Sequence, residues 1–147
     1  APQERPLVLL FVGDGPERDA LTKLAARAGS HVQMLGALSD EDVRGLYRRA
    51  AAVLLPGEED FGIVPVEAQA CGRPVIALAR GGALETVIDG ATGVLVREPG
   101  PEAFAAGIAR AGQIAFDPDV IRRHALKFGR AVFLRSIQST IEGMAHA

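Results

Sequence analysis

The stretch "PGEEDFGIVPVEAQACGRPVIAL", Pro56 to Leu78, gives the clearest indication of the fold because its pattern predicts a loop, a short helix and a strand in succession. Residues 56–62 combine proline, glycine and acidic residues, a composition typical of loops. The residues after Gly62 are small or apolar, and Pro65 is compatible with a first helical turn, where the backbone amides have no intrahelical acceptor. The β-branched run "PVIALA" (74–79) then predicts a buried strand.

Similar units surround this stretch along most of the chain. Patterns of helical spacing separate the apolar runs that predict strands, and these runs are "LVLLFVG" (7–13), "HVQMLG" (31–36), "AAVLLPG" (51–57), "PVIALA" (74–79) and "TGVLV" (92–96). Alternation of this kind predicts an α/β fold with a doubly wound, Rossmann-like parallel sheet flanked by helices. In such folds ligands bind at the carboxyl ends of the strands.

Helix boundaries are marked by capping residues and proline. Ser39 with Asp42 three residues later resembles a capping box and predicts a helix start at about residue 40. Pro101 predicts another helix start. The tail at about 117–147 is expected to be helical, with a break at Gly129. With 147 residues, one domain over 1–147 is expected.

Composition excludes several classes of function. The net charge of −2 and the lack of a basic cluster argue against a nucleic-acid or anionic-membrane surface. Cys71 is the single cysteine, so an intrachain disulfide is excluded, and the scattered histidines have no metal-ligand spacing. We therefore expect no metal site. No apolar run approaches a membrane span and no leader pattern is visible, and with the single cysteine this predicts a cytoplasmic protein.

The turn "GDGP" (13–16) follows the first apolar run and partly matches a dinucleotide-binding fingerprint. Arg18 stands where the third glycine is needed, so we interpret this turn as a tight strand-to-helix connection and exclude an NAD site.

The loop after 51–57 predicts a phosphate site. The amides of residues 61–64 lie at the start of the helix, where they lack intrahelical acceptors, and Gly62 has no side chain to keep a ligand away. These amides and the positive end of the helix dipole favour an anion.

Two glutamates, Glu59 and Glu67, flank this phosphate position. Glu67 lies about one turn into a largely buried helix, where a carboxylate needs hydrogen-bond donors, and a ribose diol supplies two. Glu59, in the loop, is placed to accept from hydroxyls of a second sugar. The spacing predicts a nucleotide-diphosphate sugar. Alternatively, Glu59 is an exposed acid favoured by the helix N-terminus, and Glu67 is satisfied by an arginine or a backbone amide.

"EDFGIVPVEAQACGRPVIA", followed by "GGALETVIDGATGVLV", resembles the carboxy-terminal half of retaining glycosyltransferases of family 4, which have the GT-B fold. The resemblance begins at "LLFVGDGPERDAL", covers nearly the whole chain and includes the E-x7-E motif. It implies a donor-binding domain of a transferase that moves a hexose from a nucleotide-diphosphate sugar to an unknown acceptor, with retention at the anomeric carbon and without metal or cofactor.

The resemblance also implies roles for single residues. Glu67 binds the nucleotide ribose, and Glu59 lies by the donor sugar as the catalytic residue. The nucleobase lies against the segment that includes Ala37 and Leu38. The donor sugar and phosphate are bound by Glu59, Asp60, Phe61, Gly62 and Ile63.

Asp60 departs from the commonest form of the motif, which has glycine there. This variant resembles mannosyltransferase-like members and leads us to expect GDP-mannose. Gly81, Gly82 and Glu85 match a GG-x2-E pattern of the family, although Glu85 is equally well explained by charge stabilisation in a first helical turn.

The family's amino-terminal acceptor domain, its Arg/Lys pair for the diphosphate and the first strand of its carboxy-terminal domain are not found in these 147 residues. The chain is therefore expected to be a donor-binding fragment that is inactive alone, with peripheral membrane association through the missing domain. In the strand order 3-2-1-4-5-6, the absent strand leaves a gap between 7–13 and 51–57. We expect the gap to be closed by a strand from another chain, as in strand exchange or a homodimer, by direct pairing of the two runs, or by the parent protein.

Two alternatives stay open. One is a GT-B nucleotide-sugar epimerase, and the other is a non-catalytic module that binds a nucleotide sugar or a partner protein.

Overall fold

The computed structural model describes residues 6–145, which form two compact units with a boundary between Gly45 and Leu46. Each unit is described by itself. The predicted single domain over 1–147 stays a prediction, and its residues 1–5 and 146–147 lie outside the described residues.

The first unit contains a two-stranded parallel sheet. Its elements are β1 (Leu9–Val12), α1 (Arg18–Arg27), the 3-10 turn η1 (Gly29–His31) and β2 (Val32–Gly36). Leu9 of β1 pairs with Val32 of β2. All four residues of β1 are exposed although all four are apolar. The "GDGP" turn connects β1 to α1, as predicted, but the helix begins two residues after Pro16.

The helix α2 (Asp40–Arg49) spans the boundary between the units and is followed by a three-stranded parallel sheet of order β3-β4-β5. The further elements are β3 (Val53–Leu55), α3 (Ile63–Ala70), β4 (Val75–Leu78), α4 (Ala83–Thr86), β5 (Gly93–Val96), α5 (Pro101–Gln113), α6 (Pro118–Ala125), the 3-10 turn η2 (Leu126–Phe128) and α7 (Arg130–Ala145). Val75 of β4 pairs with Val53 on one side and with Gly93 on the other.

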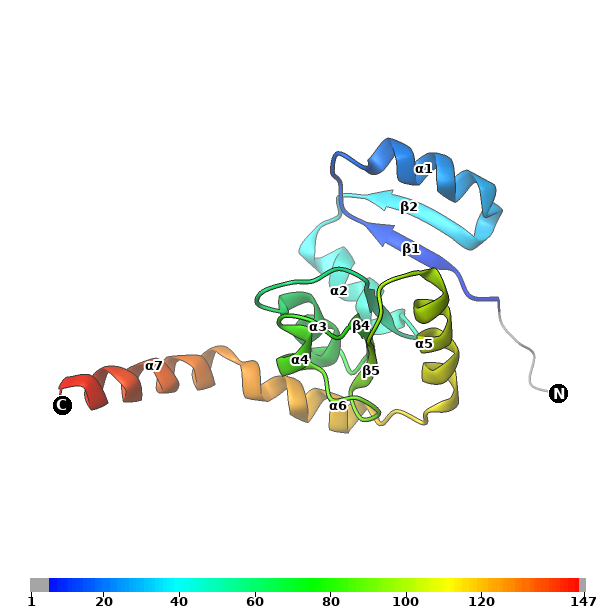
Figure 1. Ribbon diagram of the computed structural model, residues 1–147. Coiled ribbons are helices and arrows are strands. Elements are labelled where there is room, and N and C mark those ends of the chain that lie inside the picture. The colour runs from blue at the N-terminus through cyan, green and yellow to red at the C-terminus, as the bar shows by residue number, and fades with distance from the viewer. Residues whose placement is uncertain (1–5, 146–147) are drawn as a thin grey trace. The chain divides into compact units, whose positions relative to one another are not determined.

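The core of the second unit lies on both faces of this sheet, because successive side chains of a strand point to opposite faces. Val75 and Ala77 of β4 pack with Ala68 of α3, whereas Ile76 packs in the cluster that includes Phe104 and Ile108 of α5. In Figure 1, α5 covers one side of the sheet and α3 and α4 cover the other. The carboxyl end of β3 leads directly into the loop before α3.

The predicted helix boundaries are confirmed. The Ser39 hydroxyl accepts from the Asp42 amide at 3.1 Å and donates to the Asp42 carboxylate at 2.7 Å, which starts α2 at residue 40. α5 starts at Pro101. Gly129 separates η2 from α7, which has no buried residue and extends away from the rest of its unit in Figure 1.

The predicted α/β fold with parallel strands and flanking helices is confirmed, but one continuous sheet is not found among residues 6–145. Within the described residues β1 pairs with β2 and β3 pairs with β4, so direct pairing of 7–13 with 51–57, one of the three expected ways to close the gap, is not among the observed pairs. In the expected family order 3-2-1-4-5-6, β2 and β1 correspond to strands 3 and 2, and β3, β4 and β5 correspond to strands 4, 5 and 6. Strand 1 of that order has no counterpart among the described strands. A bridging strand from another chain or from the parent protein stays a prediction.

None of the helices within residues 6–145 is both long enough and apolar enough to span a membrane.

Candidate functional site

The loop between β3 and α3 ends in a helix start that lacks a side-chain cap. Gly62 is the N-cap residue in the left-handed conformation (φ 63°, ψ 39°), a region that favours glycine. Among residues 6–145, no hydrogen-bond acceptor contacts the amides of residues 61–64. The amides at the positive end of α3 are therefore free, as predicted for this loop, and anion binding by them stays a prediction.

A second loop, Gly81–Gly82, lies in backbone contact with the first. The Gly82 amide donates to the Glu59 carbonyl oxygen at 2.6 Å. A Cβ atom at Gly82 would lie 2.7 Å from the Gly62 nitrogen, and one at Gly62 would lie 3.1 Å from the Gly82 carbonyl oxygen. Only glycine permits this approach at both positions, so the two loops fix each other at the start of α3.

Glu67 lies in the middle of α3, but its side chain is exposed. The prediction of a carboxylate on a largely buried helix was therefore wrong for this residue, because the buried positions of α3 are Pro65, Ala68 and Gln69. The Tyr47 hydroxyl donates to Glu67 Oε2 at 3.4 Å. Within residues 6–145 neither an arginine nor a backbone amide contacts the Glu67 carboxylate.

Tyr47 is the functional candidate that sequence reasoning missed. Burial raises the pKa of its phenol to about 12, and the charge of Glu67, the hydrogen bond to Glu67, and smaller effects of Cys71 and Glu59 act in the same direction. The phenol is therefore a neutral donor at physiological pH and orients the Glu67 carboxylate. In the sequence Tyr47 was visible only as the single tyrosine at a core-facing helical spacing.

An open cavity of about 440 Å³ adjoins the start of α3. Phe61, 84% exposed, is part of its wall. Its lining is mainly apolar, with one cation and one carboxylate, and consists of Phe61, Ile63, Val66, Glu67, Lys127, Phe128, Val132, Phe133 and Ser136. The part of this wall that comes from residues 127–136 was not predicted from the sequence.

The structure thus brings together the predicted residues of the second unit. Glu59 is half-buried and Asp60 is exposed in the same loop. Ala37, exposed, and Leu38, half-buried, belong to the first unit and directly follow β2, so their role at a nucleobase stays a prediction. Glu85 is exposed in the first turn of α4.

No group of three or more metal-ligating His, Cys, Asp or Glu side chains gathers in the described part of the chain. The expectation of a reaction without metal or cofactor stays a prediction.

Comparison with known proteins identifies relatives of the chain. Residues 1–123 match the family described as "Glycosyl transferases group 1". The chain is 41% identical over 124 residues to the D-inositol 3-phosphate glycosyltransferase of Salinispora tropica, and the match covers 79% of this chain and 26% of that protein. The chain therefore spans about a quarter of the length of this curated relative.

Two solved structures show the same fold. Sucrose-phosphate synthase from Thermosynechococcus elongatus matches with a TM-score of 0.76 and 31% identity, over 95% of this chain and 39% of that one. Anabaena HepE, solved in complex with UDP, matches with a TM-score of 0.74 and 28% identity, over 97% of this chain and 42% of that one. The parallel α/β architecture, the family match over residues 1–123 and these relatives agree: the chain belongs to the group 1 glycosyl transferases of the GT-B fold.

Proposed function

We propose that the start of α3 is the donor site of a retaining glycosyltransferase and binds a nucleotide-diphosphate sugar. The observation that carries this proposal is the backbone contact between the Glu59 loop and Gly81–Gly82. It holds the uncapped amides of α3 and a carboxylate-bearing loop in one place. A preformed group of donors of this kind stabilises negative charge without reorganisation during the reaction.

The diphosphate binds at the amides of residues 61–64. These donors and the dipole of α3 attract the negative charge that develops on the leaving diphosphate. Lys127, in the adjoining cavity, is a cation close to this position. It supplements the Arg/Lys pair that the family uses and that was not found in the sequence.

The ribose binds at Glu67, whose exposed carboxylate accepts from both diol hydroxyls while Tyr47 holds its orientation. The transferred sugar lies at Glu59 and Asp60, with Glu59 as the catalytic residue beside the anomeric centre. The chemistry is cleavage of the bond between the anomeric carbon and the diphosphate oxygen, and formation of a bond to an acceptor oxygen with the same configuration. The acceptor proton leaves with the diphosphate.

The identity of the donor is tested by calorimetric titration of the chain with GDP-mannose, UDP-glucose and ADP-glucose. Asp60 leads us to expect GDP-mannose, whereas the UDP bound to HepE supports a uridine nucleotide. Binding of at least one of these donors in preference to the others is the expected result. Absence of binding by all three would contradict the proposed site.

Substitutions separate the roles of the two glutamates. Glu67→Ala should weaken binding of both the nucleotide diphosphate and the nucleotide sugar, because both carry the ribose. Glu59→Ala should weaken only the nucleotide sugar. Glu102→Ala, which removes an exposed acid in the first turn of α5, is the charge-matched control. Equal losses for both glutamate variants with the bare nucleotide would contradict these roles.

Catalysis requires the rest of the parent protein in this proposal. Because the chain spans about a quarter of its relative, we expect no transfer by the chain alone and transfer with retained anomeric configuration by the complete parent. Nuclear magnetic resonance of the product measures the configuration. A cytoplasmic location, membrane association through the acceptor domain and strand exchange remain predictions of this proposal.

The family match favours a transferase over the alternatives of an epimerase and a non-catalytic binding module. Epimerised donor as the product of the complete parent would support the first alternative. Donor binding without any turnover would support the second.

A further inference from the structure

A buried polar cluster lies beneath the candidate site in the second unit. Gln69 of α3 is fully buried, and His124 of α6 is 8% exposed. The Gln69 Nε2 amide donates to the Thr86 carbonyl oxygen at 2.9 Å, and His124 Nε2 contacts the same oxygen at 3.0 Å. Since a carbonyl oxygen only accepts, the His124 ring carries its proton on Nε2 in this contact.

Further hydrogen bonds connect this cluster to the Glu59 loop. The Thr86 hydroxyl donates to the Gly82 carbonyl oxygen at 2.9 Å. The Gly82 amide donates to the Glu59 carbonyl oxygen at 2.6 Å. The connection runs from α6 and α3 through α4 to the loop that carries the proposed catalytic carboxylate.

We propose that Gln69 and His124 are positioning residues that hold the Glu59 loop in its binding-competent geometry through α4. This inference rests on the proposed function for its effect on donor binding. α4 has only four residues, far fewer than a helix needs to be stable alone, so tertiary contacts must fix its orientation. Two donors from two other helices fix the carbonyl oxygen of its last residue.

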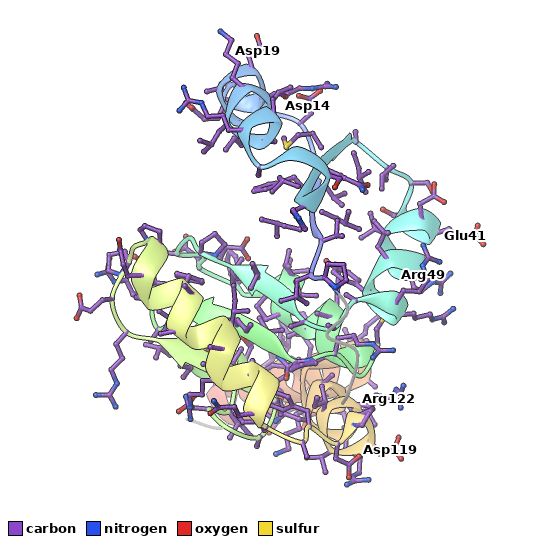
Figure 2. All side chains as sticks on the ribbon, turned by 90° about the vertical axis from the view of Figure 1, so that its right-hand side faces the viewer. Asp14, Asp19, Glu41, Arg49, Asp119 and Arg122 are labelled. Carbon is purple, nitrogen blue, oxygen red and sulfur yellow. The ribbon has the colours of Figure 1, made fainter. Side chains whose placement is uncertain are left out.

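The two helices that supply these donors pack on each other. Ile121 and Ala125, which precede and follow His124 in the sequence of α6, are buried. The Arg122 guanidinium covers Gly72 just after α3, where a Cβ atom would lie 2.9 Å from it, and also pairs with Asp119 on α6 (Figure 2). The two side chains that donate to the Thr86 carbonyl therefore come from helices that stabilise each other by packing.

Stability alone does not explain the cluster. Gln69 Oε1 and His124 Nδ1 are buried and have no hydrogen-bond partner within residues 6–145. A buried acceptor without a partner is unfavourable, and apolar side chains of similar shape are often tolerated equally well at such positions. The feature specific to this pair of polar residues is the location that they impose on the Thr86 carbonyl.

Amide hydrogen exchange of the 147-residue chain, without ligand, tests the inference. His124→Leu should accelerate exchange of the Gly82 amide and of residues 83–87 by about three- to tenfold, the effect of losing about one net hydrogen bond. His124→Gln, which keeps an Nε2 donor, should restore the slow exchange. Ile121→Val shortens a buried side chain on the same helix without removing a donor and is the matched control.

Thr86→Val provides a second variant if His124→Leu does not fold, because it removes only the hydroxyl that donates to Gly82. It should accelerate exchange at Gly82 and weaken donor binding by a similar factor. Equal exchange in His124→Leu and Ile121→Val, or failure of His124→Gln to restore slow exchange, would overturn the inference. So would unchanged exchange at Gly82 in Thr86→Val.

The exchange measurement needs no ligand, so it distinguishes the two proposals. Absence of donor binding by the unsubstituted chain contradicts the proposed function and leaves the exchange comparison intact. Normal exchange in the variants contradicts the positioning role even where the chain binds a donor.

Discussion

Replacing Glu67 by glutamine is expected to lower the pKa of Tyr47. The phenol has a pKa of about 12 instead of 10.0, and the largest cause is burial, followed by the charge of Glu67 and its hydrogen bond. Glutamine removes the negative charge and keeps an acceptor oxygen. The pKa of Tyr47 in Glu67→Gln should therefore lie between 10.0 and about 12, because burial still disfavours the phenolate.

The sequence makes this measurement unusually direct. Tyr47 is the only tyrosine and the chain has no tryptophan, so phenolate absorbance in the near ultraviolet reports this residue alone. Circular dichroism recorded at each pH confirms that the chain remains folded. Where unfolding intervenes, a rapid pH jump measures the absorbance of the folded state first.

Glu59→Gln is the matched control for this titration. The charge of Glu59 has a smaller effect on the Tyr47 pKa than Glu67 has, so Glu59→Gln should lower this pKa by less than Glu67→Gln does. The reasoning would be refuted by a Tyr47 that titrates near 10 in the folded unsubstituted chain. An unchanged pKa in Glu67→Gln would refute the contact between the two side chains.

The raised pKa of Tyr47 also predicts how stability depends on pH. Folding favours the protonated phenol, so its contribution is complete below pH 10 and is lost as the pH rises from about 10 through about 12. Tyr47→Phe should remove this dependence. Urea unfolding across this range measures it, and an equal decline in stability for both proteins would contradict the assignment to Tyr47.

Three further predictions concern other parts of the chain. Gly82→Ala should cost about 3 kcal/mol in urea unfolding because the added Cβ meets rigid backbone 2.7 Å away, whereas Gly112→Ala, with nothing within 4 Å, should stabilise by up to about 1 kcal/mol. Two hydrogen bonds from Arg110 hold the pKa of Asp89 below its ordinary value, so this contribution is present above about pH 4 and is lost as the pH falls through the folded pKa. Asp89→Asn should therefore lose less stability than the unsubstituted chain as the pH falls. An unchanged dependence of stability on pH would exclude the Asp89–Arg110 pair as a cause of the acid destabilisation. A longer piece of the parent protein that supplies a bridging strand should slow hydrogen exchange in β1, and unchanged exchange there would contradict the expected strand.

The order of helices and strands could be predicted from the sequence because its determinants are local. The cap at Ser39, the proline at residue 101 and the break at Gly129 each act on neighbours within one turn, and the structure confirms all three boundaries. The open helix start at Gly62 was predictable for the same reason. Free amides follow from the helix geometry and from a residue without a capping side chain.

Two differences from expectation came from contacts that local patterns do not report. The helix that carries Glu67 was expected to be largely buried because its residues are mainly apolar or small, but the packing of α3 buries Pro65, Ala68 and Gln69 and leaves Glu67 exposed. The pairing of β1 with β3, one of three alternatives, was considered because both strand edges need partners. Strand pairing depends on which strands are present, and periodicity does not carry that information.

The α/β class and the places where helices begin follow from the sequence, which also predicts a chemical centre formed by the Glu59 loop and by Glu67 of α3. The contacts of that centre depend on the folded structure. Tyr47 reaches Glu67 across 20 positions and His124 reaches Thr86 across 38. The approach of Gly82 to Gly62 depends on how two loops pack. Helix caps and strand patterns depend on a few adjacent residues, whereas these contacts exist only after whole elements have packed, and side-chain volumes throughout the core set their geometry.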